Sequence, residues 1–355
     1  MHLEDGTKPA AYKKYTAKKI GIVVGMFLFL ILFALFAISV GSVRIPIQDV
    51  ILTLLTGPGG TGLFDRVIWN IRIPQIITAL LAGAGLAVAG VAMQSILKNP
   101  LASPYTLGLS NAAAFGAAVG ILIFGLGTTG NNMADAISVD NPYLVTICAF
   151  IFSMAASVII LIVAKIRSAT PEVMILAGVA LNSLAVAGLA AIQYFVDETK
   201  VAAIVFWQFG DVARAGWTEI IIIGIVVIIC FIYFIWKRWD FNAMDAGDET
   251  AKSLGVNVSR LRLVGMIAAS LISAVVVSFL GVIGFVGLVC PHIMRRLIGD
   301  DHRYLIIGTA ICGALLLLIS DTVARTMISP HVLPVAIITS FLGAPIFLYL
   351  IVRGK

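Results

Sequence analysis

Charged residues are scarce in this chain. Asp, Glu, Lys and Arg make up 12% of its 355 residues, whereas hydrophobic residues make up 60%. The mean hydropathy is +1.06. A water-soluble fold of this size needs a far more polar exterior. The scarcity of charge therefore excludes a soluble protein, and apolar runs near the roughly 20-residue length of a membrane-spanning helix predict an all-α polytopic membrane protein.

Several motifs that carry chemistry are also absent. The chain contains no G-x-x-x-x-G-K-[ST] phosphate-binding loop, which excludes ATP binding by that route. No carboxylate pair lies at the centre of an apolar run, and this disfavours an ion-coupled secondary transporter. We also find no nucleophile–base arrangement. We therefore predict a protein that is not an enzyme and needs no cofactor.

Cysteine and histidine are few and badly placed for metal binding. The four cysteines, Cys148, Cys230, Cys290 and Cys312, all lie within apolar runs, and their spacing fits neither a disulfide framework nor a zinc site. We predict no metal site.

Asp321 stands four residues before Arg325, which is the spacing of a local ion pair on a helix.

About ten apolar runs can be read as spans of a compact bundle. They cover roughly 20–40, 72–95, 105–125, 143–164, 173–196, 217–236, 261–280, 283–297, 304–325 and 331–352. With both termini in the cytoplasm, the inner segments carry 18 of the 24 Lys and Arg residues and the outer loops carry six. Positive charge accumulates on the cytoplasmic side, so this orientation is expected, and the net charge of +6 needs no nucleic-acid partner.

This orientation divides the chain into a cytoplasmic N-terminal tail, residues 1–19, and a single transmembrane domain, residues 20–355. Spans two to five start outside and spans seven to ten start inside, which leaves room for an inverted repeat. Two stretches break the pattern. Residues 201–210 are too short to span and predict a helix at the outer surface or a re-entrant segment. Residues 281–299 hold glycines at 281, 284 and 287 and also Pro291, which predicts a short or broken helix or a closely packed span.

The largest inner loop, 245–255, has the end signals of a short helix. Its signals are Asp245 as a possible cap, Asp248 and Glu249 at the positive N-terminal end, Lys252 four residues after Asp248, and Gly255 for a left-handed C-terminal position. Such a helix could serve as a lever for a soluble partner, or could simply join two spans.

Three stretches together resemble one family. They are RIPQIITALLAGAGLAVAGVAMQSILKNPLASPYTLGLSNAAAFGA (72–117), GDETAKSLGVNVSRLR (247–262) and GVIGFVGLVCPHIMRRLIGDDHRYL (281–305). The order of NPLASP and GFVGL-x-x-PH-x-x-R is specific. The chain resembles the FecCD family, the permease subunits of binding-protein-dependent ABC importers for iron–siderophore, haem and cobalamin. The likeness covers nearly all of the chain after the N-terminal tail.

The resemblance implies a ten-span permease that forms a homodimer in the cell membrane. It implies two copies of a cytoplasmic ABC ATPase and an extracytoplasmic substrate-binding protein as partners. Residues of the coupling element that would sit in the ATPase are Asp245, Gly247, Asp248, Glu249, Lys252, Leu254 and Gly255. Residues of the translocation path would be Gly178, Asn182 and Ser183, although Asn182 could equally make an interhelical hydrogen bond.

On the outer face the resemblance assigns arginines to docking of the binding protein. Arg72 and Arg325 match such positions, and charge-assisted pairs there would register the partner. The chain departs from the pattern at Gln75, where many relatives have a second arginine, so Arg66 could substitute.

We therefore predict the membrane subunit of an ABC importer for a metal chelate, most plainly a ferric siderophore or cobalamin. The alternatives are import of haem or molybdate by the same fold, and an ion-coupled secondary transporter.

Overall fold

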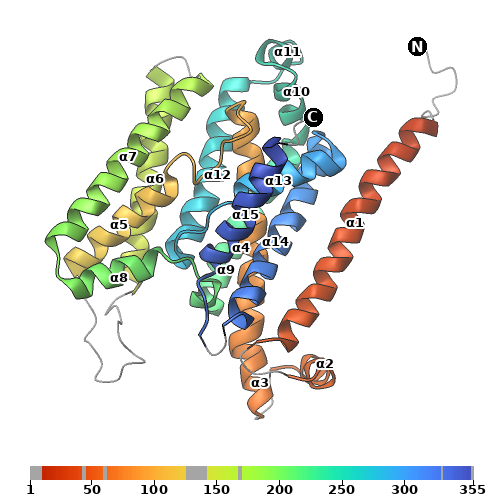
Figure 1. The fold of residues 1–355 in the computed structure, drawn as a ribbon. Coiled ribbons are helices and arrows are strands. Elements are labelled where there is room, and N and C mark those ends of the chain that lie inside the picture. The colour runs from red at the N-terminus through yellow and green to blue at the C-terminus, as the bar shows by residue number, and fades with distance from the viewer. Residues whose placement is uncertain are drawn as a thin grey trace.

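The computed structural model is a bundle of helices (Figure 1). It describes residues 10–41, 45–58, 62–124, 142–166, 170–328 and 331–352. Within these ranges no β-strand forms, and extended backbone pairs only at two isolated bridges. The predicted all-α architecture is confirmed.

The long helices account for most of the predicted spans. They are α1 (Ala10–Ser39), α4 (Ile73–Ile96), α5 (Leu109–Phe124), α6 (Pro142–Ile166), α7 (Pro171–Phe195), α9 (Trp217–Trp236), α12 (Val258–Leu280), α14 (His302–Thr326) and α15 (Val335–Val352). The short helices are α2 (Ile47–Thr56), α3 (Leu63–Val67), α8 (Glu198–Gln208), α10 (Arg238–Asp245), α11 (Asp248–Ser253) and α13 (Val286–Ile298). One π-helical turn, Ile68–Arg72, joins α3 to α4.

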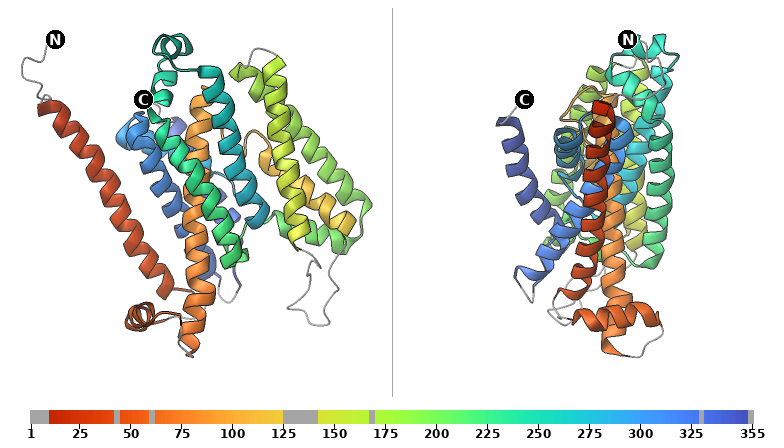
Figure 2. Two further views of the ribbon diagram at one scale, coloured as in Figure 1. Left: turned by 180° about the vertical axis from the view of Figure 1, so that it is seen from behind. Right: turned by 90° about the vertical axis from the view of Figure 1, so that its right-hand side faces the viewer.

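Seven of the described helices are long and apolar enough to cross a membrane, and α5 and α15 are shorter apolar helices. In Figure 1 the first turn of α1, the last turn of α15 and the pair α10–α11 lie at one end of the bundle. Helices α2, α3 and α8 lie at the opposite end, as the second view in Figure 2 also shows for α2 and α3. This arrangement matches the predicted orientation, with the termini and the 245–255 loop on one face.

Helix α1 begins at Ala10, so the described part of the predicted N-terminal tail, residues 10–19, is helical. Residues 1–9 lie outside the described residues. The run 283–297 is one of the ten apolar runs, and residues 281–299 are expected to form a short or broken helix or a closely packed span. Helix α13 has 13 residues and a rise of about 20 Å, less than the hydrocarbon thickness, so the short helix is confirmed.

The predicted break near residue 281 is confirmed. Helix α12 ends at Leu280 and is followed by its C-cap Gly281 at φ +81°, and α13 starts after Phe285 at φ +66°. The extended backbone between them pairs with the segment after α8, where the Val282 N–H donates to the Gln208 carbonyl at 3.3 Å and the Asp211 N–H donates to the Leu280 carbonyl at 2.8 Å. Non-helical backbone inside an apolar bundle is therefore satisfied by other backbone.

The short run 201–210 forms α8, a helix at the outer end of the bundle, as predicted (Figure 1). Asp197 caps it by accepting a hydrogen bond from the Lys200 N–H at 3.0 Å. Arg214 donates hydrogen bonds to the carbonyls of Trp207 and Phe209 at the other end of α8. A cation there complements the negative end of the helix.

Helix α4 is the centre of the bundle, and small residues let its neighbours approach. A Cβ at Gly83 would fall on the backbone of Gly313 in α14, and a Cβ at Gly90 would fall on the backbone of Gly287 in α13. Backbone-to-backbone contact of this kind is how helices gain packing energy in lipid, where apolar side chains gain little by leaving the solvent.

We predict that Gly90→Val lowers the free energy of unfolding by about 3 kcal/mol, because the new side chain has only rigid backbone to displace. The thermal midpoint of the purified chain in detergent measures the effect. Gly21→Val is the matched control, since nothing lies within 4 Å of a Cβ at Gly21. Equal midpoints for the two variants would contradict the close packing of α4 on α13.

Candidate functional site

The helix pair α10–α11 protrudes at the cytoplasmic end of the bundle (Figure 1). Ala251 of α11 is fully buried against the rest of the protein, whereas the side chains of Glu249 and Lys252 are exposed. Leu254 follows the helix and is 68% exposed. The outer surface of α11 thus offers one exposed apolar side chain beside an exposed acid–base pair.

The ends of α11 agree only partly with the predicted helix. Gly255 takes the left-handed conformation at φ +82°, its N–H donates to the Lys252 carbonyl, and the Val256 N–H donates to the Ala251 carbonyl, each at 2.9 Å. These two bonds form a Schellman C-cap, which confirms the role predicted for Gly255. At the start, Gly247 at φ +118° holds the N-cap position without a side-chain bond.

Asp245 does not cap α11, contrary to the prediction. It is the last residue of α10, and its carboxylate reaches inward to His302, with 2.8 Å between Oδ2 and Nε2. Lys252 also departs from the predicted spacing. Its Nζ lies 2.8 Å from Oε1 of Glu249, three residues before it, and does not pair with Asp248.

Asp248 instead ties α11 to two membrane helices. Its carboxylate lies 2.8 Å from Nζ of Lys98, just after α4, and 3.0 Å from Nη2 of Arg262 in α12. The buried Arg262 also donates from Nε to the Ile96 carbonyl at 3.2 Å. Burial raises the pKa of the Asp248 carboxyl, but the hydrogen bonds from Lys98 and Arg262 outweigh it and hold the pKa below the ordinary value of 3.8.

A second set of contacts holds α10 on the start of α14. The Asn242 side chain accepts a hydrogen bond from the His302 N–H at 2.8 Å and donates one to Oδ1 of Asp301 at 3.0 Å. Burial raises the pKa of Asp301, but bonds from Arg303 and Asn242 dominate and lower it to about 2. Asn242, Asp301 and His302 were not predicted from the sequence as parts of this site, because their partners lie about 60 residues away along the chain.

We predict that Asp248→Asn lowers the free energy of unfolding by about 1–2 kcal/mol, since charged hydrogen bonds to Lys98 and Arg262 are lost while the carboxylate is partly solvated. Because the folded pKa lies below 3.8, the contribution is present above that value and is lost as the pH falls through the folded pKa. Chemical unfolding at pH 7 and at low pH tests both statements. A deficit in the variant that is equally large at pH 2 would contradict the assignment.

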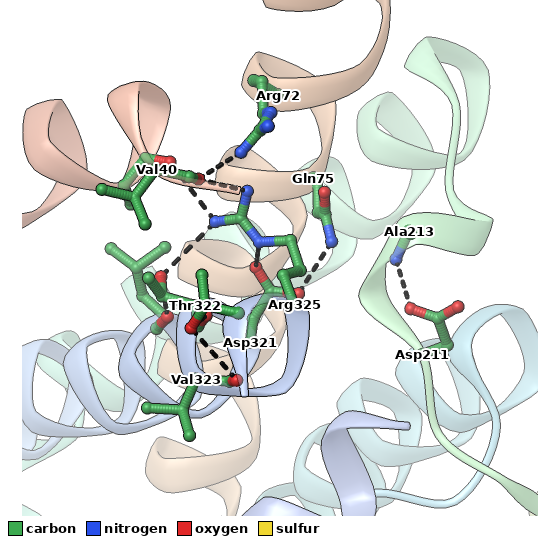
Figure 3. Close-up of polar contacts among 12 residues, drawn as sticks. Val40, Arg72, Gln75, Asp211, Ala213, Asp321, Thr322, Val323 and Arg325 are labelled. Atoms are coloured by element: carbon green, nitrogen blue, oxygen red, sulfur yellow. Dashed lines mark hydrogen bonds and ion pairs between the residues drawn. The ribbon is translucent and has the colours of Figure 1, made fainter. Parts of the chain in front are cut away.

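At the opposite end of the bundle, a buried charge cluster joins three helices (Figure 3). The Arg325 Nε lies 3.0 Å from Oδ2 of Asp321, and the Gln75 Nε2 donates to Oδ1 of the same carboxylate at 2.8 Å. Arg72 and Arg325 both donate to the Val40 carbonyl beyond the end of α1. Cations at a helix C-terminus stabilise it, so the cluster fastens α1 to α4 and α14. The i,i+4 pair predicted for Asp321 and Arg325 is confirmed.

This geometry changes the meaning of the predicted docking arginines. Arg72 and Arg325 are each 4% exposed, so neither guanidinium is available to an outside partner in this structure. Of the three arginines, Arg66 in α3 alone is exposed. Gln75 stands where the family resemblance implied a second arginine, and its neutral amide satisfies the second oxygen of Asp321 without adding a third buried cation.

The predicted path residues lie together on α7. Gly178 packs against Leu107, where a Cβ would approach within 2.8 Å, and Asn182 packs against the backbone near Gly108. The Asn111 Nδ2 donates to Oδ1 of Asn182 at 2.7 Å. Asn182 therefore makes an interhelical hydrogen bond, which was the alternative left open. Ser183 is exposed, and its hydroxyl donates to the Val179 carbonyl.

A family model described as the FecCD transport family matches residues 28–353. The chain belongs to the FecCD transport family. It is 53% identical to a Methanocaldococcus jannaschii protein named as an ABC transporter permease, over 97% of this chain and 98% of the relative. It is 36% identical to the hemin transport system permease protein of Yersinia pestis, over 81% of this chain and 84% of the relative.

A solved structure described as an inward-facing conformation of a metal-chelate type ABC transporter shares the fold. Its TM-score is 0.79 at 28% identity, and the match covers 95% of this chain and 100% of that one. This FecCD protein is therefore a multi-pass protein of the cell membrane and an ABC permease, and the family works with an ATPase and a substrate-binding protein. Among the described residues, no group of three His, Cys, Asp or Glu side chains is placed to hold a metal ion.

Proposed function

We propose that this FecCD permease forms a homodimer that imports a metal chelate, with a cytoplasmic ATPase bound to α11 of each copy. The observation that carries the proposal is the construction of α11: an exposed outer surface at Glu249, Lys252 and Leu254, and an inner side braced by Asp248 to α4 and α12. A surface helix that only joined two spans would need no such bracing.

The bracing suits transmission of a mechanical step. When two ATPases close on nucleotide, their movement would reach the membrane helices through α11. An element held by charge-assisted contacts to several helices moves with them as a rigid body, which is what alternating access requires. The chain's own residues form the translocation path and connect it to the ATPase, and the ATPase hydrolyses ATP.

A metal chelate is the substrate class supported by the relatives, since one is named for hemin transport and one solved structure is described as metal-chelate type. The path helix α7 offers the amide of Asn182 and the hydroxyl of Ser183 and no charged side chain between Glu172 and the end of the helix. A weakly polar lining of this kind passes a ligand without holding it. Selection among chelates is then the task of the binding protein.

Docking of the binding protein is assigned to the outer end of the bundle, where α2, α3 and α8 lie. Arg66 is an exposed cation there that could pair with an acidic partner. Arg72 and Arg325 would act indirectly, by fixing α1 against α4 and α14 beneath the docking surface.

Reconstitution tests the transport function. Proteoliposomes would hold the chain with its ATPase, receive binding protein on the outside, and be offered a ferric siderophore, haem, cobalamin and molybdate. We expect uptake of one chelate that needs both ATP and binding protein. Uptake driven by an ion gradient without ATP would contradict the importer, and uptake of molybdate in place of the chelates would correct the substrate class.

The ATPase-binding role of α11 has its own test. We predict that Leu254→Asp reduces co-purification of the ATPase about tenfold, because it places a solvated charge where an apolar contact would form. Leu63→Asp, a similarly exposed leucine at the opposite end of the bundle, should leave co-purification unchanged. Equal loss in both variants would mean that α11 is not the contact.

A further inference from the structure

A buried histidine lies beneath α10. His302 is 0% exposed, and its Nε2 lies 2.8 Å from Oδ2 of Asp245 and 3.0 Å from Oγ of Ser95. The ring also packs on Phe241 of α10, with 5.5 Å between ring centroids. The side chain of His302 thus contacts the last residue of α10 and the last turn of α4, and His302 is itself the first residue of α14.

The chemistry of the imidazole favours one arrangement. With hydrogen on Nε2, the ring donates to the Asp245 carboxylate, and Ser95 lies within reach of the same atom. Nδ1 has no hydrogen-bond partner among the described residues, so Nε2 is the ring nitrogen that makes the hydrogen bonds. The contact is therefore a charge-assisted hydrogen bond to Asp245, stronger than one between neutral groups.

The two helices that meet at His302 also touch along the rest of their length. Halfway along, Gly83 of α4 and Gly313 of α14 are in backbone contact. At the outer end, Gln75 of α4 donates to Asp321 of α14 at 2.8 Å. Helices α4 and α14 are therefore joined at three levels, and His302–Ser95 is the joint nearest to α10–α11.

We propose, resting on the function proposed above, that His302 is a positioning residue that couples the α10–α11 element to the α4–α14 pair. Asp245, Ser95 and Asn242 complete the joint. Asp248 holds α11 to the end of α4 and to α12, while His302 holds α10 to α4 and α14. The element then cannot slide over the bundle when the ATPase moves it, and its displacement passes into the two central helices.

Two substitutions at one position separate the hydrogen bond from the packing. His302→Leu keeps an apolar side chain against Phe241 but removes the donor to Asp245. His302→Gln can return an amide N–H near the position of Nε2. The measured quantity is the number of ligand molecules taken up for each ATP hydrolysed in proteoliposomes. We expect His302→Leu to lower this ratio about tenfold, as for the loss of one hydrogen bond to a charged group, and His302→Gln to restore most of it.

A matched pair of carboxylates on α10 provides the control. Asp245→Ala removes the partner of His302 and should lower the ratio as His302→Leu does. Asp240→Ala removes a carboxylate of the same helix that pairs with Lys237, three residues before it, at 2.8 Å, and should leave the ratio unchanged. Co-purification of the ATPase should be the same in all four variants, because the outer surface of α11 is untouched.

A wild-type ratio in His302→Leu and Asp245→Ala would overturn the role of His302, as would a His302→Gln variant that fails as badly as His302→Leu. If the unmodified chain shows no ATP-dependent uptake, the proposed function fails, and hydrogen exchange on the purified chain decides the joint separately. In that measurement His302→Leu and Asp245→Ala should increase exchange at the amides of 241–251, whereas Asp240→Ala should not. Equal exchange in the three variants would overturn the joint itself.

Discussion

The pairing of α4 with α14 is the constraint on which the rest of the structure depends. The two helices touch backbone to backbone at Gly83 and Gly313, and polar contacts join them near both ends, at Ser95–His302 and Gln75–Asp321. In lipid, close approach and internal hydrogen bonds replace the hydrophobic effect as the source of helix association. Helices α1, α9, α12 and α13 then pack around this pair, and α10–α11 rests on its cytoplasmic end (Figures 1 and 2).

Charged side chains are paired differently at the two ends of the α4–α14 pair. At the outer end, two arginines are shared between one carboxylate and the carbonyls at the end of α1, so buried charge is spread over peptide dipoles. At the cytoplasmic end, each carboxylate of the coupling element has a dedicated partner, Asp245 with His302 and Asp248 with Lys98 and Arg262. The carboxylates of Asp245 and Asp248 are partly exposed, so these contacts act as charge-assisted hydrogen bonds and not as fully buried ion pairs.

Much of the fold follows from local sequence. The apolar runs, the excess of inner Lys and Arg, the break at Gly281 and the C-cap at Gly255 are all read from neighbouring residues. The side-chain contacts of the candidate site are harder to predict from local sequence. Asp245 looked like a cap because Ser, Thr, Asp and Asn before a helix usually are caps, and nothing local reveals that His302, 57 residues later, takes its carboxylate.

Arg72 and Arg325 show what a family resemblance cannot predict. A resemblance transfers a residue's position but not its exposure, and exposure depends on what the neighbouring helix does. Here the Val40 carbonyl just after α1 lies close enough to accept hydrogen bonds from Arg72 and Arg325. The neutral Gln75 bonds to Asp321 without adding a third buried cation, which would repel the other two. Because both guanidinium groups are buried, a partner could affect them only by moving α1. Helix α1 is in direct contact with α14, and His302 joins α14 to α10 at the opposite end of the bundle.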